Sequence, residues 1–377
     1  MVSKKMIPLT PKNKKITPFK RRSQPKSQGN KIGGKKLAPK KQLLKRFYSN
    51  PILEPHQGNS WETKATFNPA AIYEDGKVHL LYRAIGESDM SALGYASSKS
   101  GLYFSERLAE PAYTPTHVLG NTAPRTSAPA IPYASGGGGW GGAEDPRIVK
   151  IGDRLYMTFL AFNGWDSARI ALTSISWEDF LNKQWDWKKP VFISPPGEVH
   201  KNWVLLPEKI NGKYAVLHSI SPKVLIDYFD NLEELGDENY IKSYHGRSGR
   251  KGAWDNWVRG AGPPPIKTKR GWLLLYHAMD ERDPNRYKLG AMLLDLRDPT
   301  KILYRSSSPV LEPDESYENE GNKPGVIYSC GAVTVKDKLL VYYGGADKFA
   351  CVAEAALGEF IADLIADKKP GLKKTPR

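Results

Sequence analysis

Two adjacent acids follow a glycine-rich segment in the stretch GGGGWGGAEDPRI, residues 136–148. Pro146 restricts the residue before it to extended conformations and removes a backbone donor, which predicts that Asp145 is held in one direction where a strand begins. Arg147 can steady a carboxylate or bind an anion. The glycines predict a mobile lip beside this acid. The same residues also fit an ordinary turn at the entrance of a strand.

Three basic side chains occupy comparable positions further along the chain, in loops or at strand ends. Lys201 and Arg259 precede two segments with hairpin patterns, and His277 ends the second of them. If these segments are neighbours in space, the three side chains can converge on an anion. The alternative is that both cations are solvated and the histidine is a hydrogen-bonded core residue.

One acid that faces a set of cations suits the cleavage of a glycosidic bond. Such cleavage needs an acid to protonate the departing oxygen and a nucleophile on the opposite face of the sugar. A phosphate nucleophile already carries negative charge, so the protein must supply cations to hold it rather than a second carboxylate base.

These residues flank five copies of one pattern, in which a β-rich strand, a polar turn and a second strand follow one another. Three of the five turns carry Asp-Gly, Gly-Asp or Asn-Gly, which is typical of hairpins. Repeated small antiparallel sheets suit a radial array, so the pattern predicts an all-β fold, a five-bladed β-propeller over residues 47–365. The alternative is a coincidence of common hairpins. The five segments are residues 72–83, 148–159, 209–218, 266–277 and 333–344, and a short helix is predicted at residues 357–366.

The formal charge of +16 is concentrated at the N-terminus. Residues 1–46 hold 16 Lys and Arg and no acid, which leaves 40 basic and 40 acidic residues for the remainder. This segment has too few apolar residues to offset its ordering entropy, so we expect a disordered basic tail. Such a tail can contact nucleic acid or an anionic surface, or it can serve only as a solubilising extension. Residues 366–377 are predicted to form a second, shorter basic tail.

Neither a secretory signal nor a run of about 18 apolar residues is found in the sequence, which predicts a cytoplasmic protein without a transmembrane segment. Cys330 and Cys351 lack metal-ligand spacing, so we expect buried apolar residues and no metal site. A homo-oligomer stays an open alternative.

Several ordered motifs resemble glycoside hydrolase family 130, and the match runs from about residue 66 to 355. That family contains β-mannoside phosphorylases and some β-mannosidases on a five-bladed propeller. The resemblance implies an inverting β-mannoside phosphorylase that releases mannose 1-phosphate from β-linked manno-oligosaccharides, with inorganic phosphate as co-substrate and no cofactor. The motifs are GAEDPRI at 142–148, KN at 201–202, PEKINGKY at 207–214, GAGPPPI at 260–266, GAMLLDL at 290–296 and YYGGAD at 342–347.

The resemblance also implies a role for each matched residue. Asp145 is implied to be the general acid, which acts through a sugar hydroxyl rather than on the leaving oxygen directly. Arg147 is then expected to be the partner of that carboxylate. The implied phosphate-binding residues are Lys201, Asn202, Arg259 and His277, and the implied substrate-binding residues are Asn68, Arg83, Glu144 and Asp347.

One position departs from the family pattern. The phosphorylases commonly have Arg after the strand that ends in His218, whereas this chain has Ser219. Loss of this cation leaves two alternatives: an inverting β-mannosidase that uses water, or a catalytically weak propeller attached to nucleic acid by its tail. Since three basic residues of the cluster remain, phosphorolysis is favoured. The acids that could activate water in a mannosidase are Glu208, Asp255 and Asp280.

Overall fold

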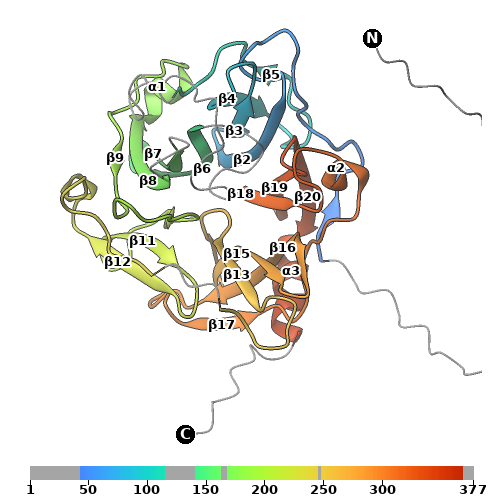
Figure 1. The fold of residues 1–377 in the computed structure, drawn as a ribbon. Coiled ribbons are helices and arrows are strands. Elements are labelled where there is room, and N and C mark those ends of the chain that lie inside the picture. The colour runs from blue at the N-terminus through green and yellow to red at the C-terminus, as the bar shows by residue number, and fades with distance from the viewer. Residues whose placement is uncertain (1–42, 115–140, 163–167, 245–247, 368–377) are drawn as a thin grey trace, which may run out of the picture. The chain divides into compact units, whose positions relative to one another are not determined.

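The computed structural model describes residues 43–114, 141–162, 168–244 and 248–367, and strands dominate these segments. They form twenty strands in four sheets, with three short α-helices (Figure 1). The all-β prediction is confirmed. Among the described residues, no helix is long and apolar enough to cross a membrane.

The largest sheet consists of two antiparallel halves. A short parallel pairing joins them, in which Met90 lies opposite Gly141 and Ser91 opposite Gly142. The first half contains β2 (Ala65–Glu74), β3 (Lys77–Ile85), β4 (Met90–Ser98) and β5 (Glu106–Arg107), and the second contains β6 (Gly141–Ile151), β7 (Arg154–Phe162), β8 (Ala168–Ser176) and β9 (Val191–Phe192).

Two further sheets come from the middle of the chain, and all their pairings are antiparallel. The smaller one contains β10 (Val204–Leu205), β11 (Tyr214–Ser219) and β12 (Leu225–Phe229). The larger one contains β13 (Trp257–Ala261), β14 (Ile266–Thr268), β15 (Gly271–Asp280), β16 (Asp283–Leu294) and β17 (Ile302–Arg305).

The fourth sheet joins the two ends of the described chain. It contains β18 (Ile327–Val335), β19 (Lys338–Gly345) and β20 (Phe349–Ala356), and β1 (Lys45–Arg46) pairs with β20 at its edge (Figure 1). Leu44, just before β1, is fully buried. The predicted boundary of the tail at residue 46 therefore lies inside an ordered segment.

All five predicted hairpins are present. The residues paired next to each turn are Glu74 and Lys77, Ile151 and Arg154, Thr268 and Gly271, and Val335 and Lys338, and in the third hairpin Ile210 and Lys213 form an isolated bridge. In the first turn Asp75 and Gly76 have φ values of 51° and 74°, the left-handed geometry that two-residue hairpins require.

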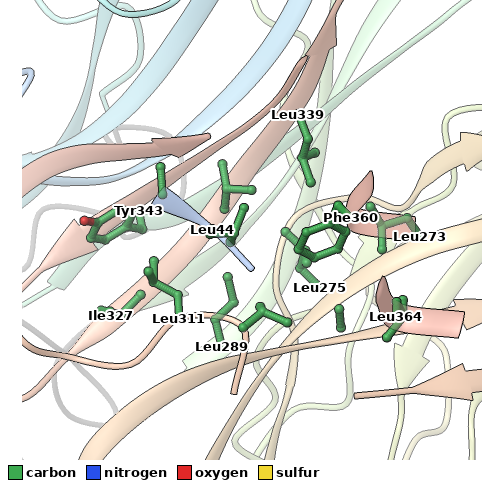
Figure 2. Close-up of a cluster of buried hydrophobic side chains, with 14 of the residues drawn as sticks. Leu44, Leu273, Leu275, Leu289, Leu311, Ile327, Leu339, Tyr343, Phe360 and Leu364 are labelled. Atoms are coloured by element: carbon green, nitrogen blue, oxygen red, sulfur yellow. The ribbon is translucent and has the colours of Figure 1, made fainter. Parts of the chain in front are cut away.

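The helices are short, and two of the three α-helices directly follow a strand. They are α1 (Trp177–Leu181), α2 (Ser316–Asn319) and α3 (Leu357–Ala366), together with the 3₁₀ turn η2 (Leu232–Glu234). The helix predicted at residues 357–366 is confirmed as α3. It buries Phe360 and Leu364 in a cluster that includes Leu273, Leu275 and Leu44 (Figure 2). Burying each such side chain contributes about 1.5–3 kcal/mol, which explains why so short a helix is held.

Three of the four sheets each contain a buried triad of one tyrosine, one carboxylate and one arginine. Tyr82 on β3 donates to Glu62 at 2.8 Å, and Arg107 on β5 donates to both of them. In two further triads a tyrosine and an arginine likewise contact one carboxylate. In all three, the residue opposite the arginine on the intervening strand lies two positions beyond the residue opposite the tyrosine. The further triads consist of Tyr276, Asp255 and Arg305, and of Tyr343, Glu318 and Arg46.

Candidate active site

Asp145 lies inside β6 at a β-bulge rather than at the entrance of the strand. The register of β6 against β7 shifts between Glu144 and Arg147, and Asp145 has a φ of 51°. The predicted extended conformation is therefore wrong: the bulge places Asp145 in the left-handed region, which aspartate tolerates better than most residues. Pro146 has no N–H to donate, and it stands where the ladder is interrupted.

The glycines ahead of Asp145 divide into two groups. Residues 136–140, most of the predicted lip, lie outside the described residues. Gly142 belongs to β6 and has a φ of 108°, and a Cβ at this position would lie 2.2 Å from the carbonyl oxygen of Ser91. This glycine thus allows β4 to approach the strand that carries the acid.

Asn68 lies in a β-bulge of the same kind as Asp145. A bulge in β2 lies between Phe67 and Ala70, and Asn68, which also precedes a proline, has a φ of 47°. Its Nδ2 donates to Oδ1 of Asp145 at 2.7 Å. Two Asx-Pro bulges on separate strands therefore point an amide and a carboxylate at each other.

Arg83 on β3 is the ionic partner of both acids. Its guanidinium lies 2.7 Å from Glu144 Oε1 and 3.3 Å from Asp145 Oδ1, with no exposure of the arginine side chain. Ser91 accepts from its Nε at 3.0 Å, and the ring of Phe67 lies 4.7 Å from its central carbon. The implied substrate-binding residues Asn68, Arg83 and Glu144 are thus grouped around Asp145.

Arg147 does not pair with the carboxylate, so that expectation is wrong. It donates to the backbone oxygens of Asp145 and Gly262, each at 2.8 Å, and to Asn202 Oδ1 at 2.9 Å. A fourth contact reaches the hydroxyl of Tyr328 at 3.4 Å. Arg147 therefore links the strand of the acid to the implied phosphate-binding residues.

Asn202 and Arg259 lie together across two segments. Asn202 has a φ of 67°, and its Nδ2 donates to the backbone oxygen of Arg259 at 2.7 Å. Gly260, with a φ of 127°, leaves room for the amide, because a Cβ there would lie 2.7 Å from Asn202 Nδ2. Arg259 follows Val258 at another bulge, and its Nε donates to the hydroxyl of Tyr287.

His277 is in the same group but is not a cation. Its Nε2 accepts from the backbone N–H of Ser329 at 2.9 Å, and its ring stacks on Tyr328 with centroids 4.1 Å apart. Burial, together with the charge of Arg147, lowers the pKa of His277 to about 3. The histidine is neutral at physiological pH, so it can serve an anion only as a hydrogen-bond donor.

Lys201 and Asp145 influence each other's protonation. Burial lowers the pKa of Lys201, although the nearby charges of Glu144 and Asp145 favour its charged form. Burial would raise the pKa of Asp145, but Arg83, Lys201 and Arg147 outweigh it and the pKa is lowered. In the free protein the Asp145 carboxyl is therefore ionised.

Asp347, at the turn between β19 and β20, has a raised pKa, in contrast to the lowered pKa of Asp145. It is buried with a φ of 51°, and Asn322 donates to its backbone oxygen at 3.1 Å. Burial raises its pKa, and the negative charge of Asp145 adds to the effect against the lowering by Lys323. Asp347 thus belongs to the same electrostatic group as Asp145.

The three acids proposed to activate water are held elsewhere. Glu208 forms an ion pair with Lys267, and Asp280 forms one with Arg282. Asp255 belongs to the Tyr276 triad. Ser219, which stands where the phosphorylases commonly have Arg, donates to the backbone oxygen of Ser221 at 3.0 Å.

Sequence reasoning missed two tyrosines of the site. Tyr328 and Tyr287 both contact the implied phosphate-binding residues. Neither stands in a motif that we related to the site, because their contacts depend on how separate sheets pack. The repeated Asx-Pro pair was a usable signal for Asn68. Among the described residues, no group of three or more His, Cys, Asp or Glu side chains is arranged to hold a metal ion.

Comparisons with known proteins show the family to which the chain belongs. Residues 38–365 match the family described as β-1,4-mannooligosaccharide phosphorylase, glycoside hydrolase family 130. A 1,2-β-oligomannan phosphorylase from Thermoanaerobacter sp. (strain X514) is 40% identical, over 82% of this chain and 96% of the relative. A β-1,2-mannobiose phosphorylase from the same organism is 38% identical, with the same two coverages.

A solved structure is also similar. The β-1,2-mannobiose phosphorylase of Listeria innocua, in complex with β-1,2-mannobiose, is 26% identical with a TM-score of 0.63. The similarity covers 86% of this chain and 99% of that one. The family match spans most of the chain, and the sequence relatives exceed a third identity over nearly their whole length. The chain therefore belongs to glycoside hydrolase family 130 and is an enzyme of that family.

Proposed function

We propose that this enzyme is an inverting phosphorylase that cleaves β-1,2-linked manno-oligosaccharides and releases mannose 1-phosphate. The observation that carries the proposal is the grouping of Asp145 with phosphate-binding candidates from separate sheets. Three arginines, Arg83, Arg147 and Arg259, lie with Lys201, whose pKa is lowered by burial, and with three carboxyl groups, one of which has a raised pKa. Arginine side chains stay charged, and such a group suits a phosphate nucleophile better than a water molecule.

The protonation of Asp145 fits this reaction once phosphate is bound. The free carboxyl is ionised because of the surrounding cations. A phosphate anion held by Lys201 and Arg259 would offset their charge and raise the pKa of Asp145. Since Oδ1 accepts from both Asn68 and Arg83, the acidic proton would be carried by Oδ2.

The cleavage is a direct displacement at the anomeric carbon. A phosphate oxygen forms a bond to the anomeric carbon while the bond to the glycosidic oxygen breaks on the opposite face. The departing oxygen takes a proton from a sugar hydroxyl, which receives the Asp145 proton. The products are α-mannose 1-phosphate and a mannoside shortened by one residue. Arg83 and Asn68 stabilise the carboxylate that is left.

The relatives support the linkage. The two described as acting on β-1,2-mannosides are 40% and 38% identical to this chain, whereas a β-1,4-mannooligosaccharide phosphorylase from Ruminococcus albus is 27% identical. We therefore propose a β-1,2-linked substrate with mannose as acceptor.

We also propose that the strands form the five blades of a propeller. The two halves of the largest sheet count separately, since only two residue pairs join them. With the other three sheets they make five antiparallel groups, each containing one predicted hairpin. The pairing of β1 with β20 would close the ring between the two ends of the chain.

The test is incubation with β-1,2-mannobiose, with and without phosphate. We expect mannose 1-phosphate only when phosphate is present, and a slower reaction on β-1,4-mannobiose. Asp145→Asn should lower the rate about 10²–10⁴-fold, because it removes the proton donor. Lys267→Ala, which removes only the exposed partner of Glu208, is the matched control. Release of free mannose at equal rates with and without phosphate would instead favour a mannosidase.

A further inference from the structure

Tyr328 contacts two of the four implied phosphate-binding residues, Asn202 and His277, without belonging to any motif noted in the sequence. It lies in β18, is 8% exposed, and belongs to a different sheet from His277, whereas Asn202 lies in the segment before β10. Its hydroxyl donates to Asn202 Oδ1, and its ring stacks on His277 at an interplanar angle of 13°. Nη2 of Arg147 donates to the same hydroxyl at 3.4 Å and also to Asn202 Oδ1.

These contacts fix which atoms of Asn202 can meet an anion. The amide oxygen accepts from both Tyr328 and Arg147, so this oxygen is engaged by two donors. The amide nitrogen gives one hydrogen to the Arg259 carbonyl, and its second hydrogen has no acceptor among the described residues. An amide turned the other way would present an oxygen and repel an anion.

The same tyrosine fixes the second neutral donor. Because His277 Nε2 accepts from the Ser329 N–H, the proton of the neutral ring resides on Nδ1. That nitrogen is buried and has no hydrogen-bond partner in the described part of the chain. The ring of Tyr328, parallel to the imidazole, holds it in this orientation.

We propose that Tyr328 is a positioning residue that orients the Asn202 amide and the His277 imidazole as phosphate donors. This rests on the proposed function, because phosphate is the anion in question. Tyr328 also joins these donors to the acid, since Arg147 bridges its hydroxyl to the backbone of Asp145.

The test compares two buried tyrosines. Tyr328→Phe keeps the ring on His277 and removes only the hydroxyl, so we expect the KM for phosphate to rise about 10-fold while the KM for β-1,2-mannobiose changes less than about 2-fold. Tyr342→Phe is the control, because that buried hydroxyl donates to the Gly101 carbonyl away from the site. A phosphate KM in Tyr328→Phe that equals the control would overturn the proposal.

A double-mutant cycle separates positioning from a general loss of stability. If the hydroxyl acts through the amide, its removal should add less than about 2-fold to the phosphate KM in an Asn202→Ala background. Additive effects would refute this route.

Direct phosphate binding, measured by calorimetry, distinguishes the two proposals. A wild type that binds phosphate without phosphorolysis would contradict the proposed function, and the Kd of Tyr328→Phe would still decide the role of Tyr328. A wild type with no affinity for phosphate would overturn both.

Discussion

Asp145 and Asp347 are buried carboxyl groups near the same cations, and their pKa values are shifted in opposite directions. Asp145 receives hydrogen bonds from Asn68 and Arg83, which stabilise its charged form. For Asp347 burial is the dominant effect, so its pKa is raised. Carboxyls whose pKa values are pushed apart can hold different protonation states at one pH. The site can therefore keep one acid ionised until an anion arrives while the other retains its proton more easily.

Replacing Asp347 should stabilise the protein and impair the enzyme. A carboxyl with a raised pKa binds its proton more tightly in the folded state, so stability is lost as the pH rises from about 4 through the folded pKa. Asp347→Asn removes this loss, and asparagine tolerates the φ of 51°. We expect an increase in Tm of about 2 °C at pH 7 and none at pH 3, with reduced mannoside cleavage.

Thermal unfolding from pH 3 to 8 checks this prediction. Asp337→Asn, in the turn between β18 and β19, is the control for the same change of residue type outside the site. A lower Tm for Asp347→Asn at pH 7 would mean that the ionised carboxylate stabilises the fold.

At the scale of elements, the bulges direct side chains into the site, whereas the triads contribute to the stability of the sheets. Bulges in β2, β6 and β13 aim Asn68, Asp145 and Arg259 toward the site. Two of the three triads lie in the same sheets as these bulges but use other residues. Asp255, which sequence reasoning considered as a catalytic base, is instead the counterpart of Glu62 and Glu318.

The triads should contribute to stability and not to activity. Tyr276→Phe removes a donor to the fully buried Asp255 at 2.8 Å, which should lower the free energy of unfolding by about 1–3 kcal/mol. Tyr82→Phe should have a similar effect, because its contact with Glu62 has the same length. Urea unfolding and phosphorolysis assays measure the two properties. A loss of activity in the folded variant would assign the triad to the site.

Local signals in the sequence predicted the hairpins and α3 because turn residues and apolar spacing act over a few positions. They did not predict the bulges, since a proline normally keeps the preceding residue extended and only pairing with a neighbouring strand overrides this preference. The partners of Arg147 were missed for a related reason. Gly262 and Tyr328 lie 115 and 181 positions away, and nothing near Arg147 indicates which sheets meet there.

At the scale of the whole molecule, the first 46 residues have two different roles: we expect residues 1–42 to add nothing to stability, whereas β1 is part of the last sheet. Arg46 forms an ion pair with Glu318 at 2.7 Å, and Glu318 has no exposed side-chain surface. Removal of one partner of a buried pair costs about 3–5 kcal/mol, because the other charge stays buried. Deletion of residues 1–42 should therefore leave the Tm unchanged, whereas deletion of residues 1–46 should lower it by about 5 °C.

The same two truncations test the basic tail. If it contacts nucleic acid, the full chain should bind RNA with an affinity that falls steeply with salt, and deletion of residues 1–42 should abolish this binding without a change in phosphorolysis. Equal RNA binding by the full chain and by the variant that lacks residues 1–42 would refute the prediction that the tail contacts nucleic acid. An equal Tm for both truncations would show that β1 adds nothing to the last sheet. The two readouts are independent, because one depends on the charges before residue 43 and the other on the strand after it.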